Sequence, residues 1–446
     1  MSTENSPQPA AGHDEAEEVT NSHWRSTALA SMANYIDAGS IVAGSTGLAM
    51  WQTKFGMSNH YVGVLGAFSS NAISAGVGAL IGGRICDLYG RKRIYQYDLL
   101  VYAFGILWII FAQNAWMLVV GYVVVGLAVG ADVPASWTLI AENAPKQARG
   151  KLGSLAQVFW NIGPLITLWL ALVLSPLGEL GTRLVFGHLF VLALVTWTLR
   201  RKMSESARWK ALAGQPQQNG AQTQNPPFWR NMSQLFSHRY IGAVVFLTVM
   251  YGVWNLEAGT GGFYLPYILR TVGGQGQAAS VGLQSITFFL GLVVLAFVFM
   301  PLNDRVNRRV LFGIGAIIQT VGYLLFAIFE LNTTVALSNV ILLGLGGGVG
   351  QQVFFQIWSG ELFPTQLRST AQGFMFAVVR IALGIWSFFV PVLAATGFHT
   401  LAWILTGFLA VSGLVGVLFA PATAGKSLER IQEERDAQFE ARASSR

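Results

Sequence analysis

Charged residues are scarce in this chain of 446 residues: only 11% are Asp, Glu, Lys or Arg, against about 25% in a soluble domain. Cysteine is nearly absent too, because Cys86 stands alone, and this excludes an intramolecular disulfide and a cysteine-ligated metal cluster. Apolar residues make up 53% of the chain, and the mean hydropathy is +0.50. These values predict a protein that lies mostly in lipid.

The sequence also lacks the motifs of common enzymes and pumps. The glycine-rich run from Gly344 to Gly350 lies within an apolar stretch and has no following Lys-Ser/Thr, so it is not a phosphate-binding loop. Paired zinc ligands and a Ser-His-Asp arrangement are not apparent. We therefore expect no enzymatic activity, no catalytic residues, no metal and no cofactor.

Twelve apolar stretches approach the roughly 20 residues that a helix needs to cross about 30 Å of hydrocarbon. Six precede a long polar insertion and six follow it. They are Thr27–Trp51, Tyr61–Gly83, Ile94–Ala112, Trp116–Ile140, Leu152–Leu174, Arg183–Leu199, Tyr240–Leu269, Ala278–Met300, Val310–Glu330, Val335–Trp358, Thr370–Ala395 and Leu401–Phe419. The predicted fold class is an all-α membrane protein with twelve transmembrane helices.

The basic residues predict the orientation and the domains. All but four of the 28 lysines and arginines fall on one side of these spans, and this side is expected to be cytoplasmic. This distribution accounts for the net charge of +7 without nucleic acid as a partner. The predicted parts are a disordered cytoplasmic tail (1–25), an N-terminal six-helix bundle (26–200), a cytoplasmic linker (201–238), a C-terminal six-helix bundle (239–420) and a cytoplasmic tail (421–446).

Two charged motifs occur twice, once in each half of the chain. Asp87-x-x-Gly90-Arg91-Lys92 is echoed by Asp304-Arg305-Val306-Asn307-Arg308-Arg309. Glu142-x-x-Pro145-x-x-x-Arg149 is echoed by Glu361-x-x-Pro364-x-x-x-Arg368. Both repeats lie almost the same distance apart, so the halves are colinear copies. Parallel halves predict a pseudo-two-fold axis along the membrane normal and a central cavity between two bundles.

The first motif resembles the signature between the second and third helices of the major facilitator superfamily. Ser204-Glu205-Ser206-Ala207-Arg208 resembles the P-E-S-P-R motif of its sugar porters without the two prolines, and Gly360-Glu361-Leu362-Phe363-Pro364 resembles their S-E-I-F-P. The resemblance implies a gate of helix-end charges on the cytoplasmic side that pair when the cavity faces outward. Its expected residues are Asp87, Arg91, Glu142, Arg149, Glu205, Arg208, Asp304, Arg308, Glu361 and Arg368. Some of these side chains are alternatively only anchors to lipid headgroups.

Ionisable residues inside the spans are candidates for proton coupling, because a charged side chain within the bilayer is energetically costly and usually has a function. Asp37 matches the position at which proton-coupled sugar porters carry an aspartate. The arginine that these porters place in the fourth helix is missing, since the chain reads Gly121-Tyr122 there. Asp132, beside Pro134, is expected to share the proton with Asp37, to bind substrate hydroxyls or to serve structure at a helix end.

Polar and aromatic residues of the spans are the expected substrate ligands, because amides offer donors and acceptors to hydroxyl groups. Gln157 matches a glutamine of the sugar-porter pattern, and Gln352 and Gln356 are four apart on one helix face. Helix-to-helix hydrogen bonds are the alternative role for each glutamine. The expected ligands are Gln157, Trp254, Asn255, Glu257, Gln351, Gln352, Gln356, Trp358 and Arg380.

Arg380 lies deep in the eleventh span, and whether it faces the cavity distinguishes between two hypotheses about the substrate. The resemblance implies a secondary transporter that imports a sugar or an inositol-like polyol with a proton as the coupling ion, and we expect the protein to be monomeric. A cavity-facing Arg380 also suits an organic-acid transporter, and an uncoupled sugar facilitator is a further alternative. A receptor that binds without carrying is disfavoured, because both charged motifs are intact in the chain.

Overall fold

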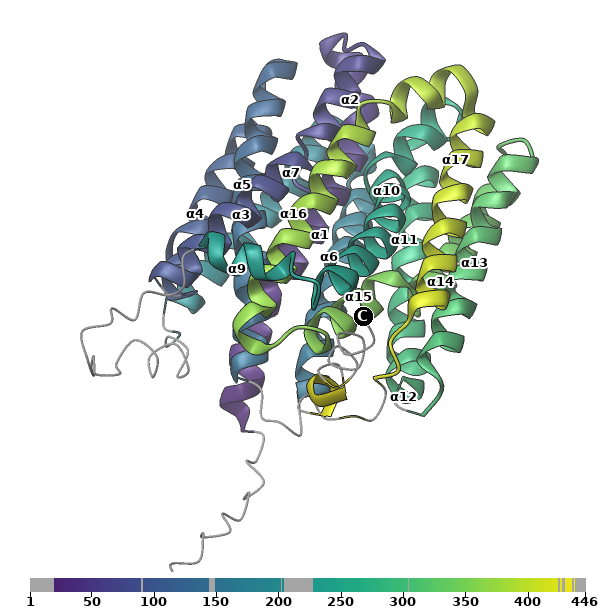
Figure 1. The fold of residues 1–446 in the computed structure, drawn as a ribbon. Coiled ribbons are helices and arrows are strands. Elements are labelled where there is room, and N and C mark those ends of the chain that lie inside the picture. The colour runs from purple at the N-terminus through teal and green to yellow at the C-terminus, as the bar shows by residue number, and fades with distance from the viewer. Residues whose placement is uncertain are drawn as a thin grey trace, which may run out of the picture.

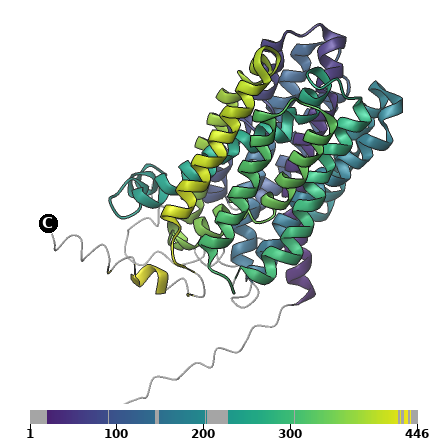
Figure 2. The ribbon, with the colours of Figure 1, turned by 90° about the vertical axis from the view of Figure 1, so that its right-hand side faces the viewer.

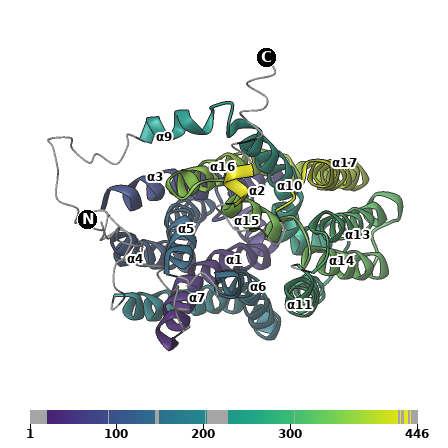
Figure 3. The same cartoon turned by 60° about the horizontal axis from the view of Figure 1, so that its bottom comes forward.

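The computed structural model describes residues 20–89, 91–143, 149–201, 203, 228–303, 305–423, 426, 430–434 and 437, apart from some side chains next to the gaps. The described chain is helical throughout. The helices run along one common direction in two bundles that lie side by side (Figure 1). A view at right angles shows them all inclined together, and a view toward the end at which α1 begins shows helices of the two halves meeting in the centre (Figures 2 and 3).

In the first bundle, five of the six expected spans are each formed by one helix, and the second span is formed by two helices, α2 and α3. The elements are α1 (Asn21–Phe55), α2 (Asn59–Ala67), α3 (Ile73–Tyr89), α4 (Arg91–Ile110), α5 (Ala115–Asn143), α6 (Arg149–Val173), the 3₁₀ turn η2 (Ser175–Leu177) and α7 (Glu179–Arg200). The left-handed backbone of Gly56, at φ 61°, ends α1.

The second bundle repeats this plan. The elements are α9 (Phe228–Leu235), α10 (Ile241–Thr271), α11 (Gln277–Val294), the π-helical turn η3 (Leu295–Phe299), α12 (Met300–Leu302), α13 (Arg308–Ile328), α14 (Thr333–Gly347), α15 (Gln351–Glu361), α16 (Thr365–Ser387) and α17 (Val390–Phe419). The short α9 lies at the side of the molecule, outside the bundles (Figure 3).

Within the described residues, nine helices are long and apolar enough to cross a membrane, and the stretches Ile73–Gly83 and Tyr97–Ile110 are shorter apolar helices. α1 is long enough but more polar, because it carries Asn34, Asp37 and Ser40. These three side chains are buried inside the protein and do not face lipid. These polar side chains therefore lower the mean hydropathy of α1, but they do not prevent this helix from spanning the membrane.

Two further expected spans are interrupted. The tenth divides into α14 and α15 at residues 348–350, within the glycine-rich run. The eleventh breaks after Ser387, and α17 begins at Val390; the non-helical backbone of Gly397 then separates the first turns of α17 from the part that forms the twelfth span. Pro391 explains the early start of α17, because a proline is well placed in the first turn of a helix, where its missing N–H would have no helical partner.

The two bundles are joined by hydrogen bonds at the end of the molecule opposite the termini. The Tyr267 hydroxyl of α10 donates to Asn59 Oδ1 of α2 at 3.2 Å. Gln277 Nε2 of α11 donates to the Thr46 carbonyl of α1 at 2.8 Å. Between them, Ser45 Oγ of α1 donates to Gln284 Oε1 of α11 at 3.1 Å. In the structure described here, the cavity is closed toward this end.

Close packing of α3 on α5 generates the first prediction. A Cβ atom at Gly130 would clash with the Ala75 carbonyl oxygen, so Gly130→Ala should lower the free energy of unfolding by about 1–3 kcal/mol. Gly187→Ala is the matched control, because a Cβ there meets nothing within 4 Å. The measurement is thermal unfolding in detergent, followed by tryptophan fluorescence. Equal melting temperatures for the two variants would contradict the packing described here.

Candidate substrate cavity and charge clusters

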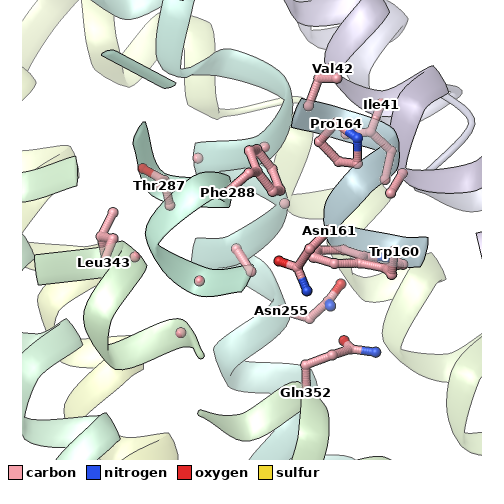
Figure 4. Close-up of a pocket in the computed structure, with 18 of the residues that line it drawn as sticks. Ile41, Val42, Trp160, Asn161, Pro164, Asn255, Thr287, Phe288, Leu343 and Gln352 are labelled. Carbon is pink, nitrogen blue, oxygen red and sulfur yellow. The ribbon is translucent and has the colours of Figure 1, made fainter. Parts of the chain in front are cut away.

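A cavity of about 130 Å³ lies between the two bundles. α1 and α6 of the first bundle line it together with α10, α11, α14, α15 and α16 of the second. Figure 4 shows Trp160 and Asn161 of α6 facing Asn255 of α10 and Gln352 of α15. The cavity is therefore built by both halves of the chain, at the interface where the internal repeat predicts it.

Six of the nine expected substrate ligands line this cavity. They are Gln157, Trp254, Asn255, Glu257, Gln352 and Arg380. Three of them present a buried polar atom without a hydrogen-bond partner, namely Gln157 Oε1, Asn255 Oδ1 and Arg380 Nε. Buried polar groups are normally satisfied, so such atoms beside a cavity indicate places where a ligand or water binds.

The other three expected ligands do not line the cavity. Trp358 is fully buried within the second bundle, where its ring packs against Phe354 with centroids 4.9 Å apart. Gln351 accepts a hydrogen bond of 2.8 Å from Gln319 Nε2. Gln356 is four residues after Gln352, but only Gln352 reaches the cavity. The helix break at residues 348–350 sets the direction of α15, and the sequence pattern does not reveal it.

The sequence analysis did not predict several of the residues that line the cavity. They are Asn71, Trp160, Asn161, Gln284, Thr287 and Gln319. A signal for two of them was present, because Trp160 and Asn161 follow Gln157 by three and four residues and so share its helix face. Asn71 had no such signal, since it lies in the irregular segment between α2 and α3.

Asp37 lies on α1 immediately before the lining residue Ala38, and its side chain is 3% exposed. The Trp160 indole, which can only donate, is within hydrogen-bonding reach of the Asp37 carboxylate. Arg380 attracts this carboxylate electrostatically across the bundle interface, and Asp132 repels it. Asp37 is therefore buried next to the cavity, with its nearest charges on α5 and α16.

Arg380 enters the bundle interface from α16. Its Nη1 donates to the carbonyl oxygen of Asn71 at 3.2 Å, and its guanidinium lies 4.5 Å from the centre of the Phe376 ring. Its Nε has no hydrogen-bond partner, and no carboxylate of the described residues forms an ion pair with it. Arg380 is 4% exposed and is a buried cation beside the cavity, not a snorkelling surface residue.

Asp132 is placed differently from Asp37, because it belongs to a buried ion pair in the first bundle. Its carboxylate accepts two hydrogen bonds from Arg200 Nη1, at 2.8 and 3.0 Å, and one of 2.8 Å from Ser136. Asp98 Oδ2 lies 3.7 Å from the same nitrogen. The remaining Arg200 nitrogens donate to the carbonyl oxygens of Leu29 and Ala30 at 2.9 and 3.0 Å. Arg200 thereby ties α7 to α1, α4 and α5.

This arrangement favours the structural role that the sequence left open for Asp132. Asp132 is not among the cavity-lining residues, and its charge is compensated. Its share in proton coupling remains a prediction. The sequence analysis did not single out Asp98, and it counted Arg200, the last residue of α7, only among the basic residues of the cytoplasmic side.

The expected cytoplasmic gate is only partly described. Arg308 Nη1 bonds the Glu361 carboxylate at 3.0 and 3.1 Å and Thr423 Oγ1 at 3.1 Å. Arg368 Nη2 donates to the Phe363 carbonyl oxygen at 3.3 Å. The side chains of Asp87, Arg91, Glu142 and Arg149, and all of Glu205, Arg208 and Asp304, lie outside the described residues. The Arg308–Glu361 pair joins helices of the same bundle.

Two helical bundles around a shared cavity, lined by amide and indole side chains among apolar ones, are the architecture of a membrane transporter of the alternating-access type. The model of the family "Sugar (and other) transporter" matches residues 26–434. The chain therefore belongs to this sugar transporter family of the major facilitator superfamily. It is a multi-pass membrane transporter and not an enzyme, and such transport uses no resident cofactor.

Individual relatives agree with the family assignment. The minor myo-inositol transporter IolF of Bacillus subtilis is 46% identical over 412 residues, which cover 92% of this chain and 93% of the relative. The arabinose-proton symporter of the same organism is 26% identical and covers 82% of this chain and 85% of the relative. The crystal structure of a D-xylose-proton symporter superposes with a TM-score of 0.73 at 19% identity, over 91% and 99% of the two chains.

The Arg200 cluster generates the second prediction. Arg200→Gln leaves two buried carboxylates, Asp98 and Asp132, without their cation and should destabilise the fold by about 3–5 kcal/mol. Arg201→Gln is the control, because Arg201 is exposed and stacks only on Trp197. The readouts are the melting temperature and the monodisperse fraction in detergent. A normal melting temperature for Arg200→Gln would show that the cluster is dispensable for folding.

Proposed function

We propose that the protein imports a neutral cyclic polyol of the inositol type, or a sugar, together with protons. The observation that supports this most directly is the cavity between the bundles, where Gln157 Oε1 and Asn255 Oδ1 are buried without partners. The 46% identity to a myo-inositol transporter supports the choice of polyol. Proton-coupled relatives and structural neighbours support the coupling ion.

The chemistry of the lining suits a molecule covered with hydroxyl groups. Gln157, Asn161, Asn255, Gln284 and Gln352 come from four helices and offer amides, which both donate and accept hydrogen bonds. The indoles of Trp160 and Trp254 supply apolar faces for the C–H side of a ring. A cyclic polyol carries a hydroxyl group on each ring carbon, so it can form hydrogen bonds with many of these amides at once.

Asp37 is the proposed coupling residue. It is buried next to the cavity, and a carboxyl group in such a place is far cheaper to keep neutral than charged. A proton taken from the outer side would neutralise Asp37 and allow the loaded cavity to change its direction. Release to the inner side would restore the carboxylate. Arg380 lies on the opposite bundle, so its attraction for Asp37 changes when the bundles rock.

We further infer that the protein works as a monomer with both termini in the cytoplasm. The basic loops lie on the side of the termini, and a single chain supplies both halves of the cavity. The described structure is closed at the opposite, outer end by the Asn59–Tyr267 and Thr46–Gln277 hydrogen bonds. The cytoplasmic charges are then the gate on the side that opens in this state, and the Arg308–Glu361 pair stays formed because both residues belong to the second bundle.

A carboxylate substrate is the second candidate function. The observation that favours it is Arg380, a buried cation beside the cavity whose Nε has no partner and which forms no ion pair with a described carboxylate. A guanidinium matches a carboxylate in charge and geometry. The attraction between Arg380 and Asp37 gives this cation a role in the polyol hypothesis as well.

The third prediction concerns coupling. In proteoliposomes, a labelled inositol should accumulate when an inward proton gradient is imposed. Asp37→Asn should lower the accumulation ratio at least about tenfold, because one coupled proton contributes about a factor of ten for a gradient of about one pH unit. Exchange of the labelled inositol across the membrane should stay intact. Hexoses and small carboxylates complete the panel. Uptake restricted to carboxylates and abolished by Arg380→Ala would favour the second candidate, and equilibration that ignores the gradient would indicate a facilitator.

The fourth prediction concerns affinity. Gln157→Ala removes an amide whose Oε1 is free to bind the substrate, so the KM for the polyol should rise about tenfold, which corresponds to about 1.4 kcal/mol. Gln356→Ala is the matched control, because Gln356 does not line the cavity, and its KM should stay at the wild-type value. A larger effect at Gln356 than at Gln157 would place the substrate elsewhere.

A further inference from the structure

Glu257 is a second acidic residue at the cavity, and the coupling scheme above does not use it. It lies near the middle of α10, lines the cavity and is 3% exposed. Gly261, one turn further along α10, also lines the cavity and has no side chain to cover the carboxyl group. A substrate or a water molecule in the cavity can therefore reach Glu257.

No cation compensates Glu257 within the described part of the chain. Its hydrogen-bonding partner is the Tyr323 hydroxyl of α13. Of the other helices around α10, α16 presents Arg380 and α1 carries Asp37, but among the described contacts neither side chain forms an ion pair or a hydrogen bond with the Glu257 carboxyl group. The cavity-facing polar side chains of α11 and α15 are the neutral Gln284, Thr287 and Gln352, and α17 contributes none.

This environment differs from that of the other buried acids. Asp132 is held by Arg200, and Asp37 is attracted by Arg380. A carboxylate that is buried with one hydroxyl as its partner is very costly, so Glu257 stays neutral as long as the cavity is closed to water. When the cavity opens, water can stabilise the carboxylate and the proton can leave. A proton-carrying group must change its charge in this way between the two states of a transporter.

We propose that Glu257 is a second proton-binding site, so that each transport cycle moves two protons, one on Asp37 and one on Glu257. The proposal rests on the proton-coupled transport proposed above. In the outward-facing state, the Glu257 carboxylate takes one proton from the outer water. In the inward-facing state, the same O–H bond breaks and the proton passes to the inner water. The two sites lie in different bundles, so each half of the protein carries one proton.

The number of protons can be measured by balancing gradients in proteoliposomes whose membrane potential is clamped at zero. A proton gradient of about one pH unit balances a substrate gradient of about tenfold for one proton and about 100-fold for two. We expect about 100-fold for the wild type and about tenfold for Glu257→Gln. Glutamine keeps the shape of the side chain and its hydrogen bond with Tyr323 but cannot release a proton.

The control is Glu330→Gln, the same substitution at an exposed residue outside the cavity, and it should keep the wild-type balance. An unchanged 100-fold balance in Glu257→Gln would overturn the proposal, and so would loss of exchange in a folded variant, which would make Glu257 a substrate ligand. A wild-type balance of tenfold rules out a second proton even without the variant. Insensitivity of the wild type to the proton gradient would contradict proton coupling itself.

Discussion

The cost of placing polar groups in hydrocarbon is the constraint on which the rest of this structure depends. Each span must satisfy its own backbone, and this makes the described chain helical. Each charged side chain inside a span must turn toward protein. α1 illustrates this, because its polar residues Asn34, Asp37 and Ser40 are all buried, and they direct one face of the helix to the centre of the molecule.

The buried charges fall into two kinds that serve different purposes. Arg200 is surrounded by carboxylates and carbonyl oxygens from α1, α4 and α5, so its charge is neutralised in place. Such a cluster holds helices together, and its charges do not need to change during transport. Arg380 and Glu257 line the cavity, and neither forms an ion pair within the described structure. The energy that these groups leave unsatisfied is available to a substrate, a proton or water, and this is why transport chemistry is expected there.

The position of Arg380 also changes how coupling can operate. Sugar porters resembling this chain place the arginine that serves the first-helix aspartate in the fourth helix, within the same bundle. Here the fourth helix has Gly121-Tyr122 instead, and the cation that attracts Asp37 belongs to α16 of the second bundle. In the proposed coupling scheme, a movement of one bundle against the other alters this attraction and so links the charge state of Asp37 to the direction in which the cavity faces.

The amino-acid sequence by itself determined the twelve spans, the duplication and the sugar-porter resemblance, because hydropathy and motif spacing are local properties of the chain. It also indicated Gln157, Asn255, Glu257 and Arg380, since polar residues in apolar spans are rare. Only the tertiary structure decided that Glu257 lines the cavity while Asp132 is held by Arg200, and that Trp358 is a core residue. The physical reason is that a helix's neighbours and breaks, such as the one at residues 348–350, determine where each face points, and these depend on contacts between residues far apart in the chain.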